Sequence, residues 1–162
     1  ESVAVMLLTT QGIVFVGSLF TLGGLAELIG YAKFYWIGLS LISSALLILA
    51  ITPITFWMGP ASLMLGLGLG MLHIANFMSF AKVGEQTAMA KISPILALVG
   101  PAGGLFGGFL GAAFGASLGL QNLFFPIGLA FIGLILVISR DQAFISFLKP
   151  DDSQQLAEGQ ES

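Results

Sequence analysis

The chain has 162 residues, of which 57% are hydrophobic and 8% are charged, and its mean hydropathy is +1.03. Soluble domains carry roughly 25% charged residues, so this composition excludes a soluble domain and indicates an integral membrane protein. The net charge of −3 argues against a nucleic-acid partner, and the lack of cysteine excludes disulfides and thiolate metal sites.

Five apolar segments follow one another along the chain. Breaks in the apolar pattern place them at about residues 2–28, 34–51, 59–80, 90–114 and 120–139. Each has about the 20 residues that a helix needs to cross a bilayer, and hydrocarbon offers the backbone no partner outside the helix. We therefore predict an all-α fold, a polytopic transmembrane bundle of about five spans that occupies residues 1–140.

The basic residues test this count of spans. Lys33 follows the first span, Lys82 and Lys91 follow the third, and Arg140 and Lys149 follow the fifth. All of them therefore fall on one face, and the connections after the second and fourth spans carry no charge. The positive-inside rule then predicts a cytoplasmic C-terminus and an N-terminus on the opposite side of a plasma (cell inner) or organelle membrane.

The character of the chain changes after Arg140. The stretch DQAFISFLK has apolar residues at helical spacing, which is typical of a short helix at the membrane interface. From Pro150 onward the chain is acidic and polar. We therefore expect residues 141–162 to form an interfacial segment followed by a disordered cytoplasmic tail, with a docking tail for a partner as the alternative.

A glycine-rich stretch, GPAGGLFGGFLGAAFG, occupies residues 100–115. It fits neither the phosphate-binding loop nor the dinucleotide fingerprint, because the required lysine, serine and flanking strand are missing. Two rows of glycine recur at intervals of four residues: Gly103, Gly107, Gly111 and Gly115, and Gly100, Gly104 and Gly108. In a membrane helix such rows form a smooth surface for a neighbouring helix, used either for passive packing or for sliding, and Pro101 permits a kink.

Polar residues inside the spans are candidates for function, because burying them without partners is costly. Gln11 lies in the first span, and His73 and Asn76 lie three residues apart in the third, beside a stripe of small residues at Gly66 and Gly70. Histidine changes charge near neutral pH, so His73 could couple protons, bind substrate or ligate a pigment or haem metal. The alternative is a hydrogen bond to a neighbouring helix.

Enzymatic chemistry is not expected. No acidic residue lies inside a span, so a Ser-His-Asp set cannot be assembled at a plausible depth. Clusters of metal-ligating residues are also missing from the sequence. We therefore predict no catalytic residue, no bound metal and no other cofactor, unless His73 ligates a pigment or haem.

Two motifs carry a family resemblance. In GGLAELIGYAK, Gly23, Glu27 and Gly30 match the spacing of a G-x-x-x-D-R-x-G-R-R loop, with Lys33 one place late and the other basic residues replaced. The second motif is GPAGG, at residues 100–104. With the predicted topology, the chain resembles the C-terminal half of a major facilitator superfamily transporter, and its spans would match helices eight to twelve.

This resemblance implies transport of an unidentified small solute by alternating access. Gln11, His73 and Asn76 would line the solute cavity, because helices eight, ten and eleven face it in that family. The family has twelve spans and seven are missing here, so we expect a missing N-terminal half or a partner membrane protein. The alternative is a non-transporting subunit that docks into a larger membrane complex, one that could contain pigment or haem.

Overall fold

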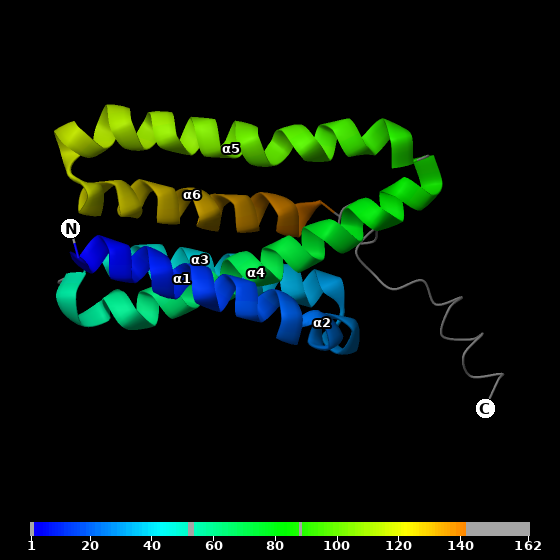
Figure 1. Cartoon of the computed structure of the whole chain (residues 1–162), viewed down its shortest axis with the longest axis horizontal. Helices are drawn as coiled ribbons and strands as arrows, with labels where there is room; N and C mark the ends of the chain where they lie inside the picture. Colours follow the sequence, from blue (N-terminus) through cyan, green and yellow to red (C-terminus); the bar gives the residue numbers. More distant parts are fainter. Residues whose placement is uncertain (1, 52–53, 88, 142–162) are drawn as a thin grey trace.

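A computed structural model describes residues 2–51, 54–87 and 89–141, and the regular structure in these ranges is entirely helical (Figure 1). The predicted all-α fold is therefore confirmed. The helices are α1 (Ser2–Thr21), α2 (Gly23–Ile29), α3 (Tyr31–Ile51), α4 (Ile54–Thr87), α5 (Met89–Leu118) and α6 (Leu120–Arg140).

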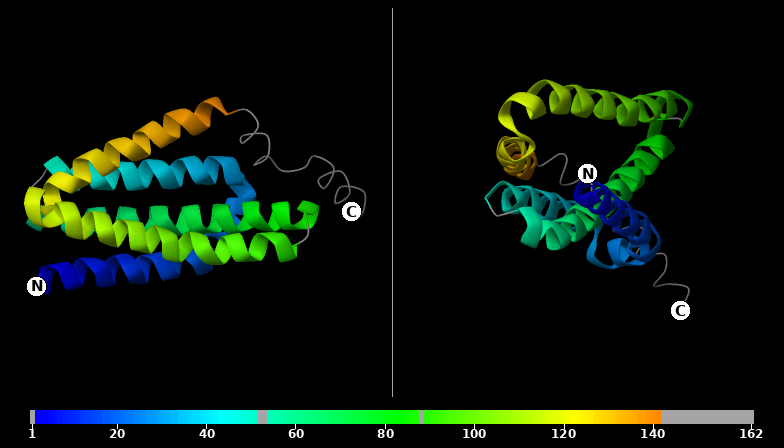
Figure 2. Two further views of the ribbon diagram at one scale, coloured as in Figure 1. Left: turned by 90° about the horizontal axis from the view of Figure 1, so that it is seen from above. Right: turned by 60° about the vertical axis from the view of Figure 1, so that its left-hand side comes forward.

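The central helix of the bundle is α4. It packs against α1 on one side and α3 on the other, and α6 packs against α3. Side chains of α3 and α4 form one buried cluster around Ile42, Leu49 and Ala61, and a second cluster joins these helices to α2 around Phe34 and Ala75. Figure 2 shows α5 standing apart from the other helices, and its contacts with α4 and α6 are few.

Glycines of α4 allow its close contacts with both neighbours. A β-carbon placed on Gly66 would lie 2.8 Å from the carbonyl oxygen of Gln11 in α1. One placed on Gly68 would lie 2.8 Å from the carbonyl oxygen of Gly38 in α3. Because a real β-carbon almost never comes this close, the two helix crossings depend on the missing side chains.

The described helices are consistent with a membrane protein. Three of them are long and apolar enough to cross a bilayer, at Tyr31–Ile51, Trp57–Ala81 and Gln121–Arg140. The segments Leu8–Thr21 and Gly23–Ile29 would make a fourth if this pair, bent by 61°, is one span. The predicted count of five stays a prediction, because many α5 side chains lie outside the described residues.

The first predicted span is not one continuous helix, so that expectation was wrong. The helix breaks at Leu22, directly before Gly23 and Gly24, where low helix propensity weakens the backbone. The hydroxyl of Thr21 also donates to the carbonyl oxygen of Gly17 at 3.0 Å, a bond that favours bending. A second turn follows at Gly30, whose φ of 86° is accessible mainly to glycine.

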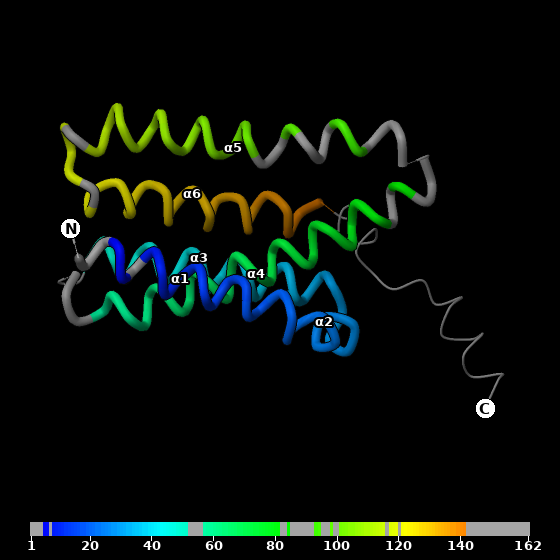
Figure 3. Tube along the Cα trace, viewed as in Figure 1, coloured from blue at the N-terminus to red at the C-terminus, as the bar shows by residue number. Residues whose placement is uncertain are grey.

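The long helices alternate in direction along the chain (Figure 1). The start of α1, the α3–α4 junction and the α5–α6 junction lie at one end of the bundle (Figure 1, Figure 3). The opposite end carries α2, the α4–α5 junction and the last turn of α6, so Lys33 and Arg140 share an end. Which end faces the cytoplasm stays a prediction, and Lys149 and the tail over residues 142–162 lie outside the described residues.

Candidate functional site

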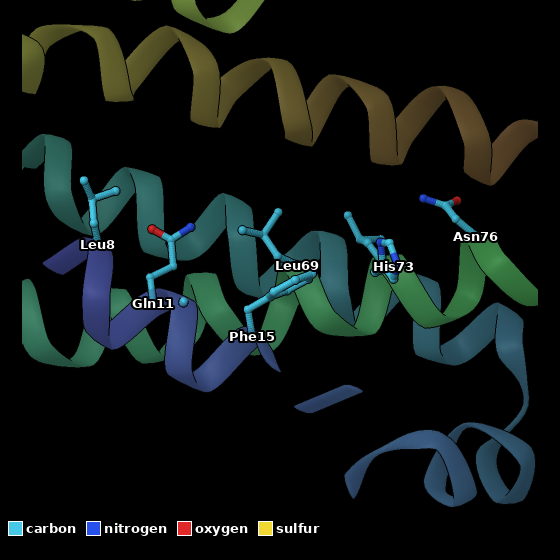
Figure 4. Close-up of a pocket in the computed structure, with 8 residues that line it drawn as sticks. Leu8, Gln11, Phe15, Leu69, His73 and Asn76 are labelled. Atoms are coloured by element: carbon cyan, nitrogen blue, oxygen red, sulfur yellow. The ribbon is translucent and has the colours of Figure 1, made fainter. Parts of the chain in front are cut away.

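A groove of about 500 Å³ lies between α1 and α4, and its lining contains the three polar residues that the sequence singled out. Figure 4 shows their side chains on the same side of the two helices, the side on which α6 lies in that view. The lining residues are Leu8, Gln11, Gly12 and Phe15 of α1, and Leu69, Leu72, His73 and Asn76 of α4.

Helical spacing brings these residues to the groove. On each of the two helices the lining positions follow the pattern i, i+3, i+4, i+7, so each helix presents one face. Gly66 and Gly70 hold the backbones together beside the groove, because neither has a side chain to separate α4 from α1. Ser18 fills the space next to Gly70. The glycines thus set the distance between α1 and α4, the two helices from which Gln11 and His73 line the groove.

The groove lies within the apolar part of the bundle. His73 is eight residues from the end of the segment Trp57–Ala81, which corresponds to about 12 Å along a helix. Polar side chains at such depth are expensive to desolvate. A histidine and an asparagine at this position therefore call for a functional or structural partner.

His73 has an aromatic neighbour. Its ring meets that of Phe15 edge to face, with centroids 5.7 Å apart and planes at 82°. This contact between α1 and α4 orients the imidazole and leaves its nitrogens available. Among the described residues, none forms a hydrogen bond with the side chains of Gln11, His73 or Asn76.

The serines of the bundle behave differently from these groove residues. Ser18 donates to the carbonyl oxygen of Phe15 at 2.7 Å, and Ser43 donates to that of Gly128 at 3.0 Å. These hydroxyl groups are satisfied by backbone oxygens and have structural roles. The side chains of Gln11, His73 and Asn76, in contrast, have no such backbone partner among the described residues.

The loop-motif residues lie away from the groove. Gly23 and Glu27 belong to α2, Gly30 joins α2 to α3, and Lys33 is in the first turn of α3. The side chains of Glu27 and Lys33 are exposed. The structure therefore places the motif at the end of the bundle and not among the groove residues, but on helices α2 and α3 with Gly30 between them, where the sequence predicts a loop.

The glycine rows of α5 meet no other helix in the described part of the chain. A β-carbon on Gly103, Gly104, Gly107, Gly108 or Gly111 would have no heavy atom of another helix within 4 Å. Large apolar side chains on the same helix are exposed as well, including Leu105 at 75% and Phe106 at 72%. Gly100, Pro101 and Gly115 lie within the same helix. The glycine contacts that do form between described helices are on α3, α4 and α6, at Gly38, Gly66, Gly68, Gly70 and Gly128.

Sequence reasoning missed the apolar part of the groove. Leu8, Phe15, Leu69 and Leu72 resemble any other apolar residue of a span, so composition offered no signal for them. Helical spacing could have found Phe15, because it follows Gln11 by four residues and therefore lies on the same face.

Comparison of the chain with protein-family models, with curated protein sequences and with solved structures finds no match. Function is therefore inferred from the groove and the helix surfaces. Among the described residues, no three histidine, cysteine, aspartate or glutamate side chains gather in a way that could hold a metal ion.

Proposed function

We propose that this chain takes part in moving a small solute across a membrane by alternating access, as part of a transporter of the major facilitator type. One observation carries the proposal: Gln11, His73 and Asn76 come from two helices, line the same groove and have no hydrogen-bond partner among the described residues. Polar side chains that gather along one groove of an apolar membrane bundle are typical of a solute pathway. The loop motif and the glycine motif of the sequence add family resemblance.

In this proposal the groove binds the solute and the surrounding helices move. The groove is open on one side, since His73 and Asn76 are exposed, so a missing half or a partner protein would cover it. The close α1–α4 crossing at Gly66 and Gly70, where Ser18 packs against Gly70, would hold the two walls of the groove at a fixed distance.

Solute uptake by vesicles tests this proposal. The full chain would be reconstituted in phosphatidylcholine vesicles together with the membrane proteins that copurify with it, and entry of small neutral solutes would be followed by light scattering as the vesicles swell. We expect entry above that of protein-free vesicles and a roughly three- to tenfold slower rate in Asn76→Ala, the loss expected for one hydrogen bond.

Asn122→Ala is the matched control for this measurement. Asn122 is also an exposed asparagine, but it lies in α6 and donates to the carbonyl oxygen of Leu118 in its own chain segment. It should transport like the unmodified chain. Equal rates in the two variants would remove the groove from the pathway, and swelling no faster than that of protein-free vesicles would refute transport by this chain alone.

A second candidate function is a non-transporting subunit of a larger membrane complex. The uncovered glycine rows and exposed aromatic side chains of α5 favour it, because a helix of a partner protein could lie directly against this surface. An absorption spectrum of the purified protein tests the pigment or haem version, in which His73 is an axial ligand. A colourless preparation would count against that version.

A further inference from the structure

Among the described residues that line the groove, none is an aspartate, glutamate, lysine or arginine. Its polar groups are the side-chain amides of Gln11 and Asn76 and the imidazole of His73. Each side-chain amide has an NH2 group that donates hydrogen bonds and a carbonyl oxygen that accepts them. A neutral imidazole has one nitrogen that donates and one that accepts. The groove can therefore complement hydroxyl, amide and carbonyl groups, but it has no fixed charge with which to neutralise an ion.

Because burying an unpaired charge is costly, a groove of this composition should favour uncharged solutes over ions. Moving an unpaired ion into an apolar bundle costs several kcal/mol, whereas a neutral polar group costs far less once it is hydrogen-bonded. Among the residues whose side chains the structure describes, the charges of α2, α3 and α6, at Glu27, Lys33 and Arg140, lie toward the helix ends. A carboxylate or ammonium in the groove would thus meet no counter-charge from the described lining residues.

The other walls of the groove are apolar. Leucines of both helices and the ring of Phe15 face the same space as the polar groups. The edge-to-face contact with His73 keeps Phe15 beside the imidazole. A ligand can bury a ring or alkyl face against these walls while its polar edge meets the amides, and a volume of about 500 Å³ is within the range of small-molecule sites.

We infer that the groove between α1 and α4 binds an uncharged solute that carries hydrogen-bond donors and acceptors on one edge and an apolar or ring face on the other. This inference rests on the proposed function, since it names the class of the transported solute. The binding itself can be measured without any transport.

The single histidine of the chain gives a specific probe of the groove. The full chain, without a polyhistidine tag, would carry isotope-labelled histidine in phosphatidylcholine nanodiscs, and the His73 ring signals would be followed by NMR. Nicotinamide would be compared with the anion nicotinate and the cation 1-methylnicotinamide, and uridine with uridine monophosphate. These sets keep the ring and change the charge.

We expect nicotinamide or uridine to shift the His73 signals saturably, and the charged counterparts to bind at least about tenfold more weakly. Asn76→Ala and Gln11→Leu should weaken neutral binding by about three- to tenfold, the loss of one hydrogen bond. Asn122→Ala should leave it unchanged, because that residue is on α6 and outside the groove.

Two outcomes would overturn the inference. The first is a charged compound that shifts His73 at the same or lower concentration than its neutral counterpart. The second is no shift by either neutral compound at concentrations up to about 10 mM, since such weak binding would carry no recognition. Neutral binding without vesicle uptake would refute transport by this chain alone and keep the ligand class. Equal uptake of charged and neutral compounds would keep transport and refute the ligand class.

Discussion

The crossing of α1 and α4 should fail when a single methyl group is added at Gly66. A β-carbon there would lie 2.8 Å from both the carbonyl oxygen of Gln11 and the β-carbon of Val14, where ordinary contacts begin at 3.4 Å. The atoms are backbone or rigidly attached to it, so α1 would have to move away by about 0.6 Å. Overpacking of this kind costs about 1–3 kcal/mol, partly offset by the better helix propensity of alanine, up to about 1 kcal/mol. We expect Gly66→Ala to destabilise the fold by about 1–2 kcal/mol.

Gly107→Ala is the matched control. Gly107 is also a helical glycine in a glycine-rich segment, but a β-carbon there would have no atom of another helix within 4 Å. The substitution should therefore be neutral or stabilise the chain by up to about 1 kcal/mol. Unfolding in detergent micelles, followed by circular dichroism over a denaturant titration, compares the two variants with the unmodified chain.

The opposite ranking would refute this account of the packing. If Gly66→Ala is as stable as the unmodified chain, α1 and α4 do not approach as closely as the structure has them. If Gly107→Ala destabilises by more than about 1 kcal/mol, the glycine face of α5 is covered in the sample, which would favour the second candidate function.

Two further predictions concern the bundle as a whole. Ser43→Ala removes the buried hydrogen bond to the carbonyl oxygen of Gly128 that joins α3 to α6, so unfolding in micelles should become easier by about 0.5–1.5 kcal/mol. Ser139→Ala, which loses only an exposed bond within α6, should change little, and equal losses would contradict an interhelical role. Because the chain lacks cysteine, single cysteines labelled with an impermeant maleimide report the membrane side of each helix end. We expect Leu28→Cys and Ser139→Cys to react from one side of the membrane and Leu118→Cys to react from the opposite side. Reaction of Leu118→Cys from the same side as Leu28→Cys would mean that α5 does not cross the membrane.

The helical class of the fold could be predicted from composition alone, because an apolar backbone segment in lipid can satisfy its hydrogen bonds only internally. The break at Leu22 could not, since Gly23 and Gly24 are tolerated inside many membrane helices. Whether they bend the chain depends on how α2 packs against its neighbours. The buried position of Ala26, in contact with α3 and α4, stabilises the bent arrangement.

Glycine spacing predicts some features of helix packing but not others. Intervals of four residues mark a smooth helix face on both α4 and α5, but the spacing is silent about which face another helix covers. In the described structure Gly66, Gly68 and Gly70 are in contact, while Gly107 and its neighbours in α5 are not.

The sequence by itself determined the apolar helices, their alternation and the identity of the costly polar side chains, because these follow from hydrophobicity and helical period. Only the tertiary structure decided that Gln11 of one helix and His73 and Asn76 of another share a groove. Bringing them together depends on the distance between α1 and α4, and that distance is set by contacts between residues far apart in the chain.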